Sequence, residues 1–367
     1  MMWRKCAFAL AGGTWIAIMV AILLLIVAIQ SFLRYQSAIY SFSGTGFIMS
    51  DPLIGYTGMP NAEMHHLTPP VYDVYTNDRG GRDNYRGRPA PKKVDFLFLG
   101  NSYVWGGGVS DEETFAKTVA RRLGVSVFNA AQPNYSMLAA LLTIDKFADM
   151  RPQYIVFGYM AELLSTNFSP CGHITAVFCR PMAYLDRRPT GLEMQPPGDA
   201  QVYSDYVHDI LFLHAFGWRD IYWTAYQDIF LTISNRTRVQ NLPRQSRTEA
   251  NSDWKSDAVW NALGLRLLVD EMAKKASSLG ATLIFVNIGD PSYSPPHEVV
   301  EAIEDGQSSG RFLYVDCAPL LQQAADARGM DHIRFPQDGH FTAAAHRIVA
   351  DAIASLVSHE ALPQETR

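Results

Sequence analysis

The sequence predicts an α/β fold in which a mostly parallel sheet carries helices on both faces. Short, uninterrupted apolar runs alternate with longer segments whose apolar residues recur at helical spacing. Such runs are typical of strands buried on both faces, as in a parallel sheet. The chain has 367 residues, of which 48% are hydrophobic and 18% are charged, so it can bury the core that this fold needs. We therefore predict a doubly wound α/β domain.

The strands and helices of this domain alternate along the chain. The predicted strands are Val94–Leu99, Val125–Phe128, Tyr154–Phe157, Thr282–Val286 and Phe312–Val315. The predicted helices are Thr114–Leu123, Met137–Ala148, Ala258–Ser278, Pro319–Arg328 and Thr342–Val357. Ser110 and Glu113 form a capping box before the first helix. Pro319 suits the first turn of its helix, where no backbone N–H is needed.

The N-terminus predicts a membrane anchor at residues 1–35. Cys6–Leu33 contains no charged residue, and about 20 apolar residues span a bilayer as a helix. Arg4 and Lys5 precede this run and only Arg34 follows it closely, which predicts a cytoplasmic N-terminus with the rest of the chain across the membrane. A cleaved signal peptide is the competing interpretation. We favour the anchor, because the run exceeds the usual signal core of about 7–15 residues.

The remainder of the chain divides into an extension and one domain with an insertion. Residues 36–90 are rich in Gly, Pro, Tyr and Asn and lack a sustained period, so we interpret them as a juxtamembrane extension packed on the domain. The domain itself spans residues 91–360. Within it, residues of about 165–255 show many aromatic side chains and little strand–helix rhythm, and we interpret them as a helical insertion that forms a lid or side subdomain.

Charge and cysteine content exclude several classes of function. The net charge of −5 and the scattered basic residues do not form the basic stripe of a nucleic-acid-binding protein. No Cys-x-x-Cys or His-Glu-x-x-His spacing occurs, so no metal site is predicted. Cys317 follows a strand, where a small buried hydrophobe is expected. Cys171 and Cys179 pair in an oxidising compartment or remain thiols in the cytosol, and both possibilities stay open.

Ser102 stands where chemistry is expected in this fold. The run Val94–Leu99 ends at Gly100, which permits a tight exit, and the serine follows two residues later. In open α/β sheets the functional crevice lies at the carboxyl ends of the strands. Gly106–Gly108 let the backbone pass close to a ligand. Ser102 is therefore a candidate nucleophile, provided that a base can take its proton.

The C-terminal segment supplies that base and a carboxylate to orient it. Asp338 and His340 lie in a polar turn before the last helix, which the fold places at the same sheet edge as Ser102. Asp338 can hold Nδ1–H of His340 and leave Nε2 to accept the serine proton. His346 falls inside the helix, and we expect it to be structural. The upstream pair Asp331-His332 is a second candidate, ranked lower because it precedes the turn.

Three motifs together resemble the SGNH/GDSL hydrolase family. They are "FLFLGNSYVWGGGVSDEETF", "VFNAAQPNYS" and "DGHFTAAAHRIVAD", and the similarity covers residues of about 94–160 and 280–355. The upstream "DPLIGYTGMPN" and "VYTNDRGGR" resemble leaders of membrane-anchored bacterial members. The resemblance implies a flavodoxin-like sheet, Ser102 as nucleophile, the Asp338–His340 pair and no cofactor. It also implies an inner-membrane protein with a periplasmic domain.

The oxyanion hole is where the chain departs from the family. The family uses the serine N–H, a second-block glycine N–H and a third-block asparagine side chain. Asn134 replaces the glycine, and asparagine tolerates the left-handed conformation, so its N–H can still donate. The third block has Gly158 but no Gly-x-Asn-Asp, which leaves Glu162 and Asn167 as substitutes. Because an ionised glutamate cannot donate, Asn167 is the predicted third donor. The aspartate of Gly-Asp-Ser is Asn101 here, and it is not the nucleophile.

These inferences lead to two hypotheses. The first is a membrane-anchored serine esterase or acyltransferase that acts on O-acyl groups, such as acetyl, of a cell-envelope or exported glycan. The second is a noncatalytic glycan-binding or assembly protein that keeps the fold with a degenerate third block. Aromatic side chains of the insertion either form a sugar-stacking platform or pack in a core, and core packing is favoured for Trp218, Tyr222, Trp223 and Tyr226.

Overall fold

The computed structural model describes residues 15, 18–25, 48–66, 70–175, 178–198, 254–336 and 338–360. The chain separates into two units, and the larger comprises residues 46–175, 179–200 and 245–367. In the smaller unit, residues 15 and 18–25 are helical and exposed. The rest of the predicted anchor lies outside the described residues. Within the ranges given above, no helix is long and apolar enough to cross a membrane.

The larger unit is built on a central sheet whose parallel part has the predicted strands. These are β6 (Phe96–Leu99), β7 (Val127–Asn129), β8 (Tyr154–Tyr159), β13 (Thr282–Asn287) and β14 (Leu313–Asp316). They lie in the order β14-β13-β8-β6-β7, and every adjacent pair is parallel. Numbered in chain order from β6, this is the 2-1-3-4-5 order of flavodoxin-like sheets. The prediction of a doubly wound sheet is confirmed.

The segment expected to be an extension supplies further strands of the same sheet. Strands β5 (Arg82–Asp83), β4 (Tyr72–Thr76) and β3 (Glu63–His66) continue the eight-stranded sheet beyond β7, each antiparallel to its neighbour. Strands β1 (Ile48–Asp51) and β2 (Gly55–Gly58) form a separate antiparallel pair. Residues 46–90 thus belong to the same compact unit as the predicted domain.

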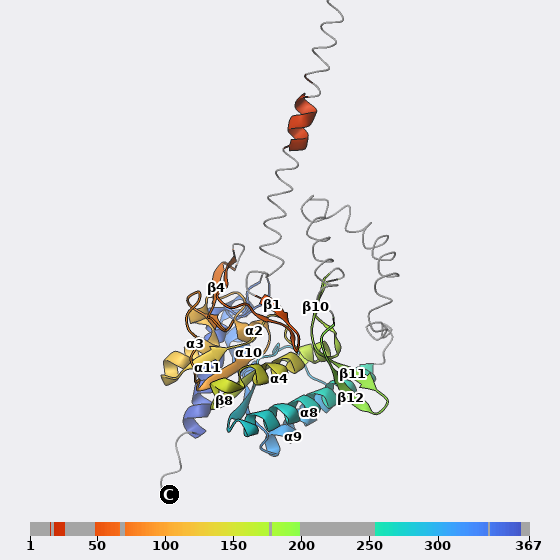
Figure 1. Cartoon of the computed structure of the whole chain (residues 1–367). Helices are drawn as coiled ribbons and strands as arrows, with labels where there is room; N and C mark the ends of the chain where they lie inside the picture. The colour runs from red at the N-terminus through yellow and green to blue at the C-terminus, as the bar shows by residue number, and fades with distance from the viewer. Residues whose placement is uncertain are drawn as a thin grey trace, which may run out of the picture. The chain divides into compact units, whose positions relative to one another are not determined.

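Helices cover both faces of the sheet. One face carries α4 (Met137–Lys146), α8 (Trp254–Ser278) and α9 (His297–Ser308), and the other carries α3 (Phe115–Leu123), α10 (Ala318–Arg328) and α11 (Ala343–Glu360) (Figure 1). Successive strand residues face opposite sides, so Leu97 packs in the first layer while Phe96 and Phe98 pack in the second. The capping box at Ser110 and Glu113 is present, but it caps the short helix η1 (Asp111–Glu113), and Thr114 caps α3 instead. Pro319 lies in the first turn of α10, as predicted.

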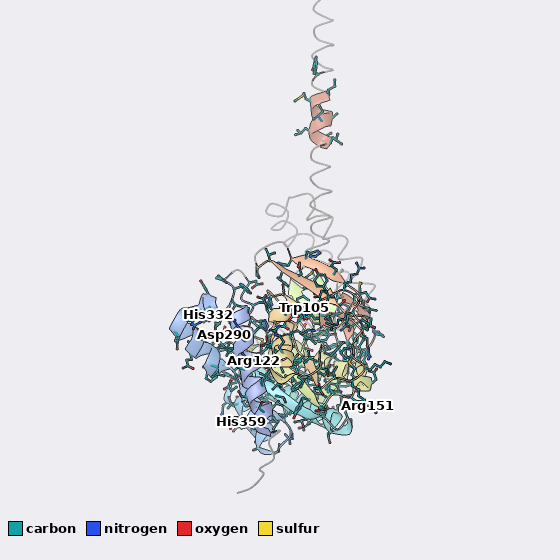
Figure 2. The ribbon with its side chains drawn as sticks, turned by 90° about the vertical axis from the view of Figure 1, so that its left-hand side faces the viewer. Trp105, Arg122, Arg151, Asp290, His332 and His359 are labelled. Atoms are coloured by element: carbon teal, nitrogen blue, oxygen red, sulfur yellow. The ribbon has the colours of Figure 1, made fainter. Side chains whose placement is uncertain are left out.

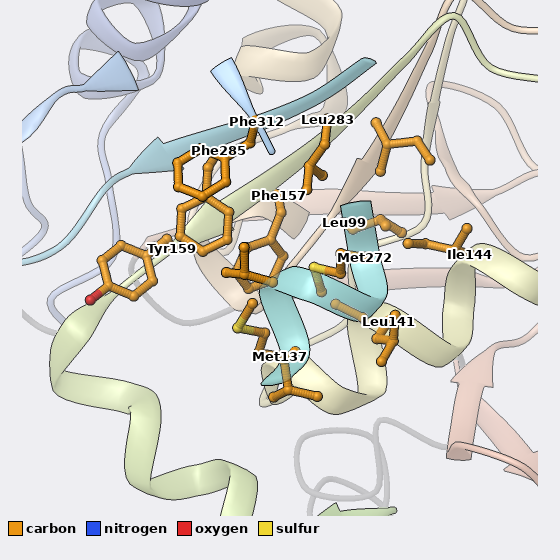
Figure 3. Close-up of a cluster of buried hydrophobic side chains, with 14 of the residues drawn as sticks. Leu99, Met137, Leu141, Ile144, Phe157, Tyr159, Met272, Leu283, Phe285 and Phe312 are labelled. Carbon is orange, nitrogen blue, oxygen red and sulfur yellow. The ribbon is translucent and has the colours of Figure 1, made fainter. Parts of the chain in front are cut away.

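Aromatic and aliphatic side chains fill the layer beneath α4 and α8 (Figure 3). The ring centroids of Phe157 and Phe285 are 5.2 Å apart, and those of Phe285 and Phe312 are 4.9 Å apart. Leu99 and Leu141 are almost completely buried beside them. Full burial of such a side chain stabilises the fold by about 1.5–3 kcal/mol. This rigid core fixes the strand ends from which the site residues project.

The described part of the predicted insertion consists mainly of strands. After η3 (Ala161–Phe168) come the paired strands β9 (Cys171–Thr175) and β10 (Phe178–Pro181), followed by the antiparallel hairpin of β11 (Tyr184–Arg188) and β12 (Gly191–Gln195). The prediction of a helical insertion is therefore wrong for this part. Residues 199–253, which include the four insertion aromatics, lie outside the described residues. The side chains of Cys171 and Cys179 do too, so their disulfide stays a prediction.

Candidate active site

Ser102 lies at the carboxyl end of β6, as predicted, and begins the one-turn helix α2 (Ser102–Trp105). Gly100 has φ +146°, and a Cβ there would lie 2.5 Å from Cγ2 of Val104, so the sharp exit from the strand requires glycine. The side chain of Asn101 caps the helix by accepting the N–H of Tyr103 at 3.0 Å. The hydroxyl therefore stands in the first turn of a helix, where backbone N–H groups have no intrahelical acceptor.

His340 reaches this serine from the other end of the chain. Its Nε2 lies 2.9 Å from Oγ of Ser102, across 238 positions of sequence. A tight loop presents the ring: the N–H of Phe335 donates to the carbonyl of His340, and the N–H of Gly339 donates to the carbonyl of Phe335, both at 2.8 Å. Helix α11 follows directly and anchors the loop. The structure thus brings together the serine and histidine that the sequence singled out.

Asp338 contacts the same histidine in two ways. Its Oδ1 accepts the backbone N–H of His340 at 3.0 Å, and its Oδ2 lies 3.1 Å from the ring Nδ1. The second contact has the distance of an ion pair, but Nδ1 makes no aligned hydrogen bond within the part of the chain that the structure describes. The Asp338 and His340 side chains are 32% and 26% exposed. Asp338 therefore orients the imidazole partly through the turn that both residues share.

Tyr103 contacts the His340 ring and Arg334 holds Tyr103, and the sequence did not identify either residue. The ring of Tyr103 lies 5.1 Å from the imidazole, centroid to centroid. Arg334 Nη1 donates to the Tyr103 hydroxyl at 2.9 Å and to the carbonyl of Gly339 at 3.3 Å. Its guanidinium also lies over the rings of Tyr103 and Phe341, 5.4 Å from each centroid. Tyr103 was signalled by its place beside Ser102, whereas no local pattern marks Arg334.

Gly107 forms the surface against which the imidazole packs. A Cβ at this position would lie 2.9 Å from Cδ2 and 3.1 Å from Nε2 of His340. No side chain fits in that space, because real Cβ contacts shorter than about 3.4 Å force a neighbour to move. This contact explains the middle glycine of the run after Ser102, because the absence of a side chain at Gly107 leaves room for the base.

Asn134 adopts the backbone conformation expected of an oxyanion donor at a glycine position. Its φ is +64°, in the left-handed region. The loop that carries it lies next to the end of β6, since the N–H of Gln132 donates to the carbonyl of Gly100 at 3.2 Å. The predicted conformation is confirmed, and the Asn134 N–H remains the candidate for the second donor.

The prediction that Asn167 supplies the third donor is wrong. Its side chain is 2% exposed, and Oδ1 accepts the N–H of Leu138 while Nδ2 donates to the carbonyl of Leu164, both at 3.0 Å. Asn167 therefore ties η3 to the first turn of α4, and its amide is committed to the backbone. It is the nearest amide after β8 in the sequence, but η3 turns its side chain into the fold.

Met160 occupies the third-block position where the family has asparagine, two residues after Gly158. Its Sδ accepts a weak hydrogen bond from Nδ2 of Asn101 at 3.2 Å, and a thioether cannot donate. The other substitute, Glu162, accepts the N–H of Asp290 at 2.7 Å. Neither Met160 nor Glu162 therefore supplies a side-chain donor, and the backbone N–H groups of Ser102 and Asn134 remain the candidate donors.

The remaining histidines of the C-terminal segment lie elsewhere. His346 is completely buried, and its Nδ1 accepts the N–H of Phe115 at 3.2 Å, which agrees with the structural role expected for it. Burial, together with the charge of Arg82, lowers its pKa to about 3, so it is neutral. His332 lies in η6 (Met330–His332), with Nε2 3.5 Å from Nη1 of Arg328. Of the two Asp–His pairs, the structure brings Asp338–His340 to Ser102.

The described residues include one free cysteine, and its environment is apolar. Cys317 is a buried free thiol, as expected, and burial raises its pKa to about 12. In the described ranges, no group of three His, Cys, Asp or Glu side chains is placed to hold a metal ion.

Comparison with known proteins gives similarity at the level of structure. No protein-family model and no curated protein sequence matches the chain. Among solved structures, a G-D-S-L family protein from Desulfitobacterium hafniense has 10% identity and a TM-score of 0.37, with 71% of this chain and 98% of that chain covered. The psychrotrophic esterase of a Pseudoalteromonas species has 10% identity and a TM-score of 0.37, with 72% and 97% covered. An acetylxylan esterase from Geobacillus stearothermophilus has 12% identity and a TM-score of 0.36, with 72% of this chain and 94% of that chain covered. The chain is similar to GDSL/SGNH esterases of known structure.

Proposed function

We propose that this chain is a serine ester hydrolase of the SGNH type, with Ser102 as nucleophile and His340 as general base. The contact of 2.9 Å between Ser102 Oγ and His340 Nε2 carries this proposal. A serine hydroxyl is a weak nucleophile until a base takes its proton, and this geometry supplies the base. Asp338 favours the imidazolium that forms, because its carboxylate lies 3.1 Å from Nδ1.

The proposed reaction proceeds through an acyl-enzyme. His340 takes the Ser102 proton while Oγ attacks the ester carbonyl, and the imidazolium then gives the proton to the departing alcohol. His340 next takes a proton from a water molecule, or from the hydroxyl of an acceptor, as that oxygen attacks the acyl carbonyl. The imidazolium then returns the proton to Ser102 Oγ when the acyl–serine bond breaks. The N–H groups of Ser102 and Asn134 stabilise the negative oxygen formed in both steps. An esterase and an acyltransferase share this intermediate and differ in the acceptor.

The proposed substrate is an O-acyl group, such as acetyl, on a cell-envelope or exported glycan. The His340 and Asp338 side chains are 26% and 32% exposed, which supports access by an ester carried on a polymer. The charge pattern of residues 1–35 supports an inner-membrane anchor with the domain in the periplasm. A reporter fused after Arg367 is expected to be active only outside the cytoplasm, and cytoplasmic activity would reject this location without affecting the chemistry.

Ester turnover tests the proposed chemistry. The wild type should hydrolyse p-nitrophenyl acetate and an acetylated oligosaccharide, and Ser102→Ala should abolish both activities. His340→Ala should do the same, whereas His346→Ala should act through thermal stability. Turnover that survives in Ser102→Ala, or the reverse pattern for the two histidines, would reject the assignment.

A second candidate is a noncatalytic glycan-binding or assembly protein. One observation favours it: Met160 stands where the family has an oxyanion donor, and losing one donor typically costs about 10²–10³ in turnover. This candidate predicts glycan binding that persists in Ser102→Ala, with no turnover in the wild type. Ester hydrolysis by the wild type would exclude it.

A further inference from the structure

Arg82, from β5, is buried at the back of the nucleophile loop. Its side chain is completely buried, and it donates hydrogen bonds to three carbonyl oxygens. Nη1 donates to Trp105 at 2.7 Å and to Gly106 at 2.6 Å, and Nη2 donates to Val109. The guanidinium also lies 4.6 Å from the centroid of the Trp105 ring, a buried side chain labelled in Figure 2. One side chain thus binds the loop 105–109 along its length.

The loop held by Arg82 begins at the end of the nucleophile helix. Helix α2 has a single turn, and a helix of this length has almost no stability of its own. The last carbonyls of a helix lack intrahelical donors, and Arg82 supplies donors for those of Trp105 and Gly106. The N–H groups of Gly106 and Gly107 in turn donate to the carbonyl of Ser102, at 2.9 and 2.8 Å. The position of Ser102 therefore depends on the loop.

The same loop contacts the base. Gly107 packs against the His340 imidazole so closely that a Cβ would lie 2.9 Å from its Cδ2. A displacement of the loop would therefore move the surface beneath His340 and the helix that carries Ser102 at once. Misplacement of reacting groups by about 1 Å can cost on the order of 10²-fold in rate.

Lysine cannot replace this arginine in full. The carbonyls of Trp105, Gly106 and Val109 are reached by two separate amino groups of one planar guanidinium. A lysine ammonium is a compact charge and cannot span the same acceptors in that geometry. It would keep the ionic partner, because Asp111 Oδ1 lies 3.7 Å from Nε of Arg82. Arg82→Lys therefore removes the set of hydrogen bonds to the three carbonyl groups while it keeps the buried positive charge.

We propose that Arg82 is a positioning residue for the Ser102–His340 pair, acting through the loop 105–109. This inference rests on the proposed function. It gives β5 a role in positioning the site, because this strand carries the arginine and joins the sheet through the pairing of Arg82 with Asn129. The residue does not touch the reacting atoms, and it acts by holding the elements that do.

Variants at Arg82 test this role against a purely structural one. Arg82→Lys and Arg82→Met should lower kcat for p-nitrophenyl acetate by about 10²-fold with little change in KM, at a temperature where both remain folded. The lysine variant should retain more activity than methionine. If Arg82→Met does not fold, the double variant Arg82→Met/Asp111→Asn also removes the buried carboxylate, which without Arg82 keeps, among the described residues, only its contact with Lys117 at 3.4 Å. The control is Arg79→Met. Arg79 pairs with Asp149 at 2.7 Å, in the same N-terminal segment but against η2 (Ala148–Met150).

Hydrogen exchange provides a second measurement that needs no turnover. In Arg82→Lys, the amides of Gly106 and Gly107 should exchange at least about 10-fold faster than in the wild type, while the amides of β8 exchange at the wild-type rate. In Arg79→Met, the amides of the loop 105–109 should exchange at the wild-type rate. Unchanged loop exchange, or equal kcat in Arg82→Lys and wild type, would overturn the inference. A wild type without turnover would reject the proposed function instead, and the exchange comparison would still decide whether Arg82 holds the loop.

Discussion

At the scale of single residues, Asn167 shows how a side chain near the site can serve the fold alone. Its amide accepts from Leu138 and donates to Leu164, so Asn167→Ala should leave turnover unchanged. The variant leaves the Leu138 N–H buried without its acceptor, which should lower the free energy of unfolding by about 1–3 kcal/mol. Chemical denaturation and ester turnover of the purified variant check both parts. A 10²-fold loss of turnover without loss of stability would restore Asn167 as an oxyanion donor.

Met160 allows the opposite test, in which a side-chain oxyanion donor is added. Met160→Asn places an amide donor at the third-block position, at the end of β8. We expect kcat on small acetyl esters to rise by about 10-fold or more, because one preorganised donor is typically worth 10²–10³. The melting temperature should fall, since a polar group replaces a buried thioether. An unchanged or lower kcat in a folded variant would show that the two backbone donors already complete the hole.

His346 predicts a specific dependence of stability on pH. Its pKa is lowered from 6.5 to about 3, mainly by burial, so the unfolded chain binds a proton at a higher pH than the folded protein does. The stability that His346 contributes is therefore full above about pH 6.5 and is lost as the pH falls toward 3. His346→Gln removes this pH-dependent contribution to stability, because glutamine does not titrate. Between about pH 6 and pH 4, the stability difference between wild type and variant should shrink by on the order of 1 kcal/mol per pH unit. A difference that stays constant would contradict a neutral buried histidine.

At the scale of elements, the loop after α2 links the nucleophile to the base. Gly107→Ala adds a Cβ that meets the His340 ring, and it should lower kcat by about 10²-fold with a small change in melting temperature. Gly264→Ala, in α8, is the matched control because its Cβ would meet a side chain, Phe168, at 3.1 Å. Equal losses of kcat in the two variants would show that packing at Gly107 has no special bearing on the base.

The elements that the sequence predicted are those with a strong local pattern. Strands β6, β8 and β13 are continuous apolar runs, and helices α3 and α11 follow clear start signals. Strand β5 has only two residues, and β3 alternates between exposed and half-buried positions at the sheet edge. Such short or edge strands exist through their neighbours, and no period in the sequence marks them. The role of Arg82 could not be predicted either, because its partners are carbonyl groups more than twenty residues away in the sequence.

At the scale of the whole molecule, the site depends on segments from both ends of the larger unit. Ser102 follows β6, His340 precedes α11, and Arg82 comes from the N-terminal strands. The sequence could predict Ser102, Asp338 and His340 because the fold class places strand ends and the last turn at one edge. Tyr103 stands next to Ser102 in the sequence, but its contact with the imidazole, that of Gly107, and the hydrogen bond from Arg334 to Tyr103 could not be predicted, because they depend on packing across the fold.

Covalent labelling of Ser102 tests the central claim most directly. A fluorophosphonate reacts with a serine only when a base activates it. Intact-mass and peptide analysis of the wild type should therefore find one adduct, on Ser102, and none in Ser102→Ala. His340→Ala should be labelled at least about 10²-fold more slowly, in line with the size of general-base effects. Wild-type protein that stays unlabelled, or equal rates in wild type and His340→Ala, would contradict the account.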